Sequence, residues 1–209
     1  PKPQNPFLLV YLIMKFINIL LAAVAAKRGV MPWLCLEICH ETSQNITSNL
    51  NQIEMNKDLI SYVSFERYGL GSNSTLNLYN LTDVNPIIQK MGLKTTPMII
   101  SVDINNMRQV FENPQPFFDS VKAETEKNGY SGWNIDWEPS DPSISDADGL
   151  NYAKFLDAFS LFTQKLGVTL QVDIATWTKV WNYTALAQTH VPQLDIMSTY
   201  TSDDPTYYN

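Results

Sequence analysis

The sequence predicts an α/β fold, namely a (β/α)8 TIM barrel that is present as an incomplete barrel with about six βα units. Two observations support this prediction. Short apolar runs rich in β-branched and aromatic residues alternate with longer stretches of helical periodicity, which indicates parallel strands joined by helical crossovers. The segment after the first expected strand reads CHETSQN and contains no glycine, which argues against a doubly wound nucleotide-binding sheet.

The expected elements follow from these two periodicities. Strands are expected at Pro32–Ile38, Tyr62–Tyr68, Pro97–Asp103, Gly132–Glu138, Thr169–Thr176 and Leu194–Tyr200. Helices are expected at Ile46–Met55, Val84–Met91, Pro116–Asn128 and Leu150–Leu166, with a short one around Tyr183–Thr189. A complete barrel takes about 250 residues, whereas this chain has 209. We therefore expect the barrel domain to be truncated at its C-terminus.

The N-terminus carries one long apolar stretch, Phe7–Ala26. It is long enough for a membrane anchor, but Met14, Lys15 and the alanines up to Ala26 are also typical of a signal peptide. On the favoured signal-peptide interpretation, residues 1–13 are a non-structural leader, residues 14–26 are the signal peptide and residues 27–209 are the barrel domain. We then expect secretion or delivery to a lysosomal or endomembrane lumen, with no stable membrane association after cleavage. Sequons at Asn45, Asn73, Asn80 and Asn182 fit this route.

Charge and cysteine content limit the possible partners and cofactors. A formal net charge of −7 disfavours nucleic acid and suits a neutral or cationic substrate. No cofactor and no metal are expected, because His40 and His190 have no ligand partners at useful spacing. On one extended strand, Cys35 and Cys39 would lie about 13 Å apart, so they can pair only if the strand ends between them. The alternatives are two buried thiols, or one thiol whose partner lies beyond Asn209.

The segment Gly129–Pro139, GYSGWNIDWEP, carries the expected chemistry. Alternate side chains on a strand share a face, so Asn134, Asp136 and Glu138 form a polar row opposite an apolar row that packs under helices. An acidic residue at the C-terminal end of a barrel strand lies at the mouth, where barrel active sites form. Two carboxylates about 6.6 Å apart along the strand cannot both ionise easily, and we expect the raised pKa to make Glu138 a general acid.

The segment Ser131–Glu138 resembles the fourth-strand signature of the family 18 glycoside hydrolases, D-G-x-D-x-D-x-E, and matches it at Gly132, Asp136 and Glu138. The resemblance implies that Glu138 protonates the glycosidic oxygen and that Asp136 orients the 2-acetamido group of the sugar, whose oxygen acts as the nucleophile. Ser131 and Asn134 depart from the signature. Asn134 can hydrogen-bond to Asp136 but cannot share its charge or proton.

Further site residues are expected around this row. Tyr200 ends the sixth expected strand in Met197-Ser-Thr-Tyr200, where the family commonly has Met-x-Tyr, and the resemblance implies a hydrogen bond to the acetamido group. The ring of Trp177 could stack on a sugar. Asn134, Glu37 and Glu66 are expected to contact substrate, and Asp173 is a weaker candidate for the same mouth.

The resemblance implies a secreted glycoside hydrolase that cleaves β-1,4-linked N-acetylglucosamine, as in chitin or chitooligosaccharides, by a substrate-assisted retaining mechanism. Its partner would be a carbohydrate containing N-acetylglucosamine. Three alternatives stay open: a chitinase-like lectin with little or no activity, an endo-acting enzyme on the chitobiose core of N-glycans, and a membrane-anchored adhesion protein if residues 7–26 are retained.

Overall fold

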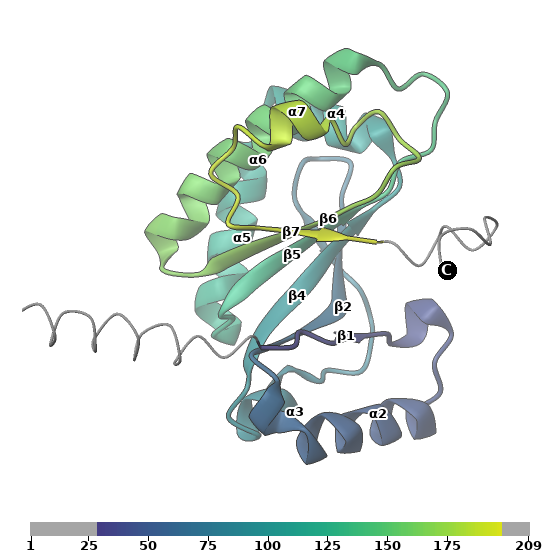
Figure 1. Ribbon diagram of the computed structural model, residues 1–209, viewed down its shortest axis with the longest axis vertical. Coiled ribbons are helices and arrows are strands. Elements are labelled where there is room, and N and C mark those ends of the chain that lie inside the picture. Colours follow the sequence, from purple (N-terminus) through teal and green to yellow (C-terminus); the bar gives the residue numbers. More distant parts are fainter. Residues whose placement is uncertain (1–28, 198–209) are drawn as a thin grey trace, which may run out of the picture. The chain divides into compact units, whose positions relative to one another are not determined.

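The computed structural model describes residues 29–197 (Figure 1). The chain divides into two units, residues 1–30 and 31–209, and the helices and strands lie in the described part of the second unit. The expected leader, signal peptide and alternative anchor therefore lie outside the described residues, as does Tyr200. None of the helices in the described part is both long and apolar enough to cross a bilayer.

One sheet contains six parallel strands that follow one another in chain order. They are β1 (Trp33–Leu34), β2 (Tyr62–Leu70), β4 (Lys94–Ser101), β5 (Gly132–Trp137), β6 (Thr169–Ile174) and β7 (Gln193–Ile196). The short β3 (Leu76–Leu78) pairs antiparallel with the end of β2. A doubly wound sheet reverses its strand order at a switch point, whereas this order never reverses. The described residues thus form an incomplete (β/α)8 barrel, and the predicted fold class is confirmed.

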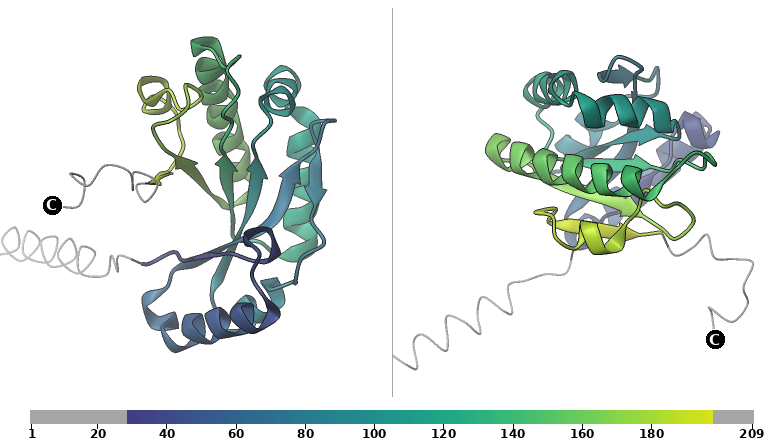
Figure 2. Two further views of the ribbon diagram at one scale, coloured as in Figure 1. Left: turned by 90° about the vertical axis from the view of Figure 1, so that its right-hand side faces the viewer. Right: turned by 90° about the horizontal axis from the view of Figure 1, so that it is seen from above.

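The helices lie on the outer, convex side of the curled sheet (Figure 2). They are α2 (Ser43–Met55), α3 (Asn85–Lys90), α4 (Ile104–Glu112), α5 (Gln115–Asn128), α6 (Asp146–Leu166) and α7 (Tyr183–Leu186), with 3-10 turns η1 (Glu37–Cys39) and η2 (Lys57–Leu59). The sequence analysis missed α4. Its signal is short: Asp103 caps the first turn by accepting the Asn105 N–H, and Ile104, Met107 and Val110 recur on one buried face.

The first expected strand, Pro32–Ile38, is shorter than predicted. β1 ends at Leu34, and the Leu36 N–H donates to the carboxylate of Glu66 at 2.8 Å instead of continuing the sheet ladder. The chain then turns through η1, which brings the Cα atoms of Cys35 and Cys39 to 5.6 Å, and the two residues form a disulfide. The alternatives of free buried thiols or a distant partner are therefore wrong.

Helix α6 packs a wide apolar face into the core, as its sequence predicted. Its rings pack with those of α5, for example Phe118 stacked on Phe162 at 4.8 Å between centroids. Trp137 of β5 stacks on Phe155 of α6 at 5.2 Å. The helix ends at Gly167, whose φ of 74° is the left-handed conformation that glycine adopts without steric cost. This packing fixes the outer face of β5 and so the direction of its inner face.

Candidate active site

The two faces of β5 are divided as the sequence predicted. Trp133, Ile135 and Trp137 are fully buried on the outer face. The Trp133 indole N–H donates to Thr125 Oγ1 of α5 at 2.9 Å, which locks that face against the helix layer. Alternation along the strand therefore turns Asn134, Asp136 and Glu138 toward the inside of the barrel.

Glu138 lies at the mouth of the barrel. It directly follows β5, and its N–H donates to the Ser101 carbonyl at the end of β4 at 2.8 Å. The C-terminal ends of parallel barrel strands are where active sites form. The side chains of Asp136 and Glu138 are both half-buried, so they remain open to a ligand while their charges are partly removed from water.

One carboxyl of this row, Asp136, has a strongly raised pKa. Burial raises the pKa of Asp136 to about 8, and the negative charge of Glu138, the hydrogen bond to Glu138 and the charge of Glu66 act in the same direction. Asp136 is thus protonated near neutral pH, and its hydrogen bond to Glu138 connects the two carboxyls. The expected role of Glu138 as general acid stays a prediction.

Asn134 lies deeper in the barrel than Asp136. Its side chain is 0% exposed, and its amide N–H donates to Asp173 Oδ1 of β6 at 3.1 Å. The sequence allows a hydrogen bond from Asn134 to Asp136, but the amide N–H binds the buried carboxyl of the neighbouring strand instead. The contact of Asn134 with substrate stays a prediction.

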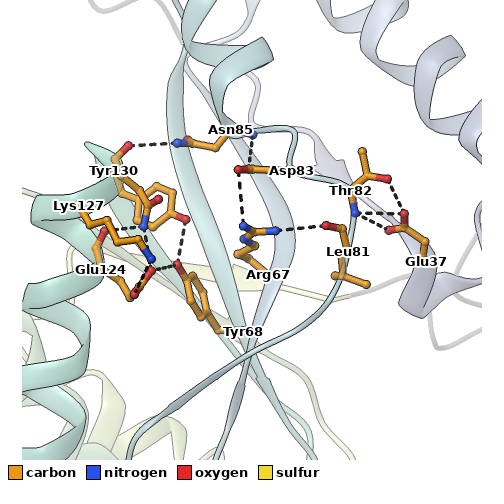
Figure 3. A network of polar contacts seen from close by, with 11 residues as sticks. Glu37, Arg67, Tyr68, Leu81, Thr82, Asp83, Asn85, Glu124, Lys127 and Tyr130 are labelled. Carbon is orange, nitrogen blue, oxygen red and sulfur yellow. Dashed lines mark hydrogen bonds and ion pairs between the residues drawn. The ribbon is translucent and has the colours of Figure 1, made fainter.

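Glu66 and Glu37 have partners within the protein. Glu66 is 4% exposed on the inner face of β2, where burial raises its pKa and the Leu36 N–H binds its carboxylate. The sugar contact expected for Glu66 stays a prediction. Glu37 is exposed and accepts hydrogen bonds from the Thr82 N–H and hydroxyl, which lower its pKa (Figure 3). Its contact with substrate stays a prediction.

Trp177 lies in the segment after β6, at the same end of the strands as Glu138. Its ring is 44% exposed and contacts Trp181 edge to face at 4.9 Å. An exposed indole at the mouth is suited to stacking on a sugar face, so stacking of Trp177 on a sugar stays a prediction.

The sequence analysis did not single out Asp195 of β7. Asp195 pairs with Asp173 on the adjacent strand. Polar and apolar residues alternate along Gln193–Ile196, and this alternation is the sequence signal for an inward-facing carboxyl.

The loop behind Glu138 is fastened by a contact that the sequence did not reveal. Arg108 of α4 binds Asp148 of α6 through two hydrogen bonds, at 2.8 and 2.9 Å, and donates to the Ser143 carbonyl at 3.0 Å. Asp148 also accepts the N–H and hydroxyl of Ser145. Residues 139–145, which connect Glu138 to α6, are therefore held at both the loop and the helix.

One group of side chains brings potential metal ligands together. Within residues 29–197, Cys35, Cys39 and Glu66 bring three potential ligand atoms within 4.8 Å of one another. The two sulfurs are joined in a disulfide and offer no thiolate. This group therefore gives no basis for a metal centre.

No family model matches the chain, and no curated protein matches it. Solved structures do match. A chitinase from Chromobacterium violaceum superposes with a TM-score of 0.67 at 13% identity, over 81% of this chain and 55% of that one. The spore cortex-lytic enzyme SleL of Bacillus megaterium gives a TM-score of 0.67 at 13% identity, over 81% of this chain and 41% of that one.

A third match is catalytic domain 2 of the Group II chitinase from Ostrinia furnacalis, which was solved as a mutant in complex with penta-N-acetylchitooctaose. Its TM-score is 0.63 at 13% identity, over 81% of this chain and 50% of that one. The chain thus spans about half the length of the solved structures that it matches. The chain shares its fold with chitinases and related glycosidases.

Proposed function

We propose that this chain carries the acid–base site of a secreted glycoside hydrolase that cleaves β-1,4-linked N-acetylglucosamine with retention of configuration. The observation that carries the proposal is the pair Asp136 and Glu138, which lies at the C-terminal end of β5 on the inside of the barrel. Asp136 holds a proton near neutral pH because its pKa is raised to about 8, and it is hydrogen-bonded to Glu138. A proton held there is available to a leaving group.

The proposed reaction uses the substrate as its own nucleophile. The acetamido carbonyl oxygen forms a bond to the anomeric carbon while the glycosidic C–O bond breaks and its electron pair goes to the leaving oxygen. Glu138, supplied with the proton of the pair, transfers it to that oxygen, and Asp136 orients the acetamido group. Water then attacks the anomeric carbon, the bond from that carbon to the acetamido oxygen breaks with its electron pair returning to the oxygen, and the water gives one proton to Glu138. Two displacements at the same carbon retain its configuration.

Two further facts support a carbohydrate substrate. The fold is that of chitinases, one of which was solved with a chitooligosaccharide. Trp177 offers an exposed ring at the mouth.

The position of the proposed acid is also supported. The Arg108–Asp148 contact holds the loop that follows Glu138, which favours a fixed position for that side chain.

The decisive experiment compares the full chain with its Glu138→Gln variant on a fluorogenic chitooligosaccharide. Glutamine keeps the size of the side chain but has no proton to donate, so we expect kcat to fall by roughly 10²- to 10⁴-fold. Glu126→Gln, an exposed change on α5, is the matched control and should leave kcat unchanged. Equal rates for wild type and Glu138→Gln, including no activity in either, would defeat the proposal.

A sugar-binding protein without activity is the second candidate, motivated by Ser131 and Asn134 at two positions of the signature. Calorimetry with chitooligosaccharides, combined with mass spectrometry after long incubation, separates the two. Binding without any product would favour the lectin, whereas product release that depends on Glu138 would exclude it.

The proposal includes secretion. The Cys35–Cys39 disulfide supports it, because structural disulfides persist mainly in oxidising compartments. Sequons at Asn45, Asn73 and Asn80 are exposed, as glycosylation requires. N-terminal sequencing of protein recovered from the culture medium should find cleavage near Ala26, and a retained Phe7–Ala26 segment would favour the anchored alternative.

A further inference from the structure

A buried carboxyl that the proposed reaction does not use lies beside the catalytic pair. Asp173 is 0% exposed on β6. The sheet pairs Ile135 of β5 with Val172 of β6 on the outer face. The residues that follow them, Asp136 and Asp173, both turn inward by alternation. Adjacent strands lie about 4.8 Å apart, so the two carboxyl groups are neighbours within the barrel.

One carboxyl oxygen of Asp173 has a hydrogen-bond donor, and the other has no partner unless the group is protonated. Asp173 Oδ1 accepts the amide N–H of Asn134 at 3.1 Å. Asp173 Oδ2 and Asp136 Oδ1 are both buried, and neither has a hydrogen-bond partner within residues 29–197. Buried acceptors without a donor are costly. A proton shared between the two carboxyl groups would satisfy both oxygens.

The titratable groups that interact electrostatically with Asp173 favour its neutral form. They are Asp136 of β5, Glu138 directly after β5, Asp195 of β7 and the Tyr152 hydroxyl of α6. None of them carries a positive charge. Burial, followed by the negative charge of Asp136, raises the pKa of Asp173 well above the usual range of a carboxyl.

We propose that Asp173 is a positioning residue of the site, whose carboxyl carries a proton on Oδ2 and donates it as a hydrogen bond to Oδ1 of Asp136. The contacts then form a continuous chain. The Asn134 amide donates to Asp173, Asp173 donates to Asp136, and Asp136 donates through its other oxygen to Glu138. The side-chain amide of Asn134 on β5 cannot act as an acid. Asp173 on the neighbouring strand β6 therefore supplies the second carboxylic acid of the site.

The catalytic consequence rests on the proposed function. When Asp136 passes its proton to Glu138 it becomes charged, and a donor from Asp173 stabilises that charge. Asp173 would thereby ease the transfer without contacting the substrate. The hydrogen bond itself does not depend on what the site catalyses.

The first test follows the alkaline limb of kcat/KM, which reports the loss of the Asp136 proton. Asp173→Asn keeps a neutral donor, so the apparent pKa of the alkaline limb should change by less than about 0.3 pH unit. Asp173→Leu removes the donor, which should move the limb to higher pH by about one unit. If Asp173 were ionised, Asp173→Asn would remove a negative charge and lower the limb, and that result would overturn the proposal.

Tyr68→Phe is the matched control, because it removes a buried hydroxyl from the outer face of the same barrel and should leave the limb in place. A shift in this control equal to that of Asp173→Leu would show that the limb reports general destabilisation, which would also count against the proposal.

The second test needs no activity and is possible even if Asp173→Leu does not fold. In the full chain labelled with ¹³C at the aspartate carboxyls, the Asp173 signal is the one missing from Asp173→Asn. It should keep the chemical shift of a protonated carboxyl from pH 4 to pH 8. Ionisation of this group below pH 7 would refute the proposal, whereas a failure of Glu138→Gln to change the rate would refute only the hydrolase assignment.

Discussion

The two faces of this barrel treat acidic residues in opposite ways. On the inside, the interior carboxyl row, defined as Glu66, Asp136, Asp173 and Asp195, consists of groups whose pKa values are raised, first of all by burial. None of the ion pairs formed within residues 29–197 includes a member of this row. On the outside, the Arg108 guanidinium and the Ser145 donors lower the pKa of Asp148.

The difference separates groups that stabilise the fold from groups that cost stability. An outer carboxylate bound by a cation favours the folded state at neutral pH. A buried carboxyl without a cation disfavours it, and such local conflicts are typical of functional sites. The interior row therefore marks the chemistry of the barrel more clearly than any single residue does, and substitutions on the two faces should act with opposite sign.

The largest expected effect on stability is the loss of pH dependence in Asp136→Asn. The carboxyl titrates at 3.8 when unfolded and at about 8 when folded. Between these values the folded chain binds more protons than the unfolded chain, so the free energy of unfolding falls as pH rises from 4 to 8. Asparagine does not ionise, so the fall should be smaller by on the order of 3 kcal/mol. Urea unfolding at pH 4.5 and pH 8.5 measures both slopes.

Asp119→Asn, an exposed change on α5, is the control for Asp136→Asn and should keep the wild-type slope. If Asp136→Asn also kept that slope, Asp136 would not be a raised carboxyl, and the contrast between the two faces would fail at its most important position.

On the outer face, Arg108→Leu should destabilise the chain by about 2 kcal/mol at pH 7, because Asp148 is only 5% exposed and loses its cation. The pKa of Asp148 is lowered in the fold, so its contribution is present above the unfolded pKa of 3.8 and is lost as pH falls below it. The deficit of Arg108→Leu should thus shrink below about pH 3.

The double variant Arg108→Leu with Asp148→Asn tests this cause. Removing the orphaned charge should recover part of the loss, and denaturant unfolding of the four chains gives the coupling energy of the pair. Additive losses would mean that Arg108 acts only through its contacts with Ser143.

The sequence predicted what depends on short-range periodicity. Alternation fixed the two faces of Trp133–Glu138, and the wide apolar face that ends at Gly167 located α6 closely. Strand alternation with helices then predicted the barrel. These signals are local, because each residue's direction follows from its immediate neighbours along the chain.

The sequence did not predict properties that depend on contacts between distant residues. The raised pKa of Asp136 depends on burial and on the charges of two residues, Glu138 and the distant Glu66. Asn134 was paired with its neighbour along the strand, but its partner is Asp173, 39 positions away. The early end of β1 depends on the carboxylate of Glu66, 30 positions away from Leu36. No pattern within one segment carries this information.

The smallest expected effect tests the outer face where it has no contact with the site. Tyr68 is 1% exposed, and its hydroxyl donates to Glu124 at 2.7 Å and lies 3.0 Å from the Tyr130 hydroxyl (Figure 3). Tyr68→Phe keeps the ring packed against Trp133 and loses only these hydrogen bonds, so we expect a loss of about 1 kcal/mol at pH 7.

The sign of the pH dependence identifies the cause of this loss. Burial alone would raise the pKa of Glu124, but hydrogen bonds from Tyr68 and Asn128 and the charge of Lys127 outweigh it and lower the pKa. The contribution of the Tyr68 hydroxyl is therefore present above the unfolded pKa of about 4.5 and declines as pH falls through the folded value. Urea unfolding of Tyr68→Phe at pH 7 and pH 3 should show a smaller deficit at pH 3. A deficit that grew in acid would place Glu124 with the interior carboxyls, and the division between the two faces would no longer hold.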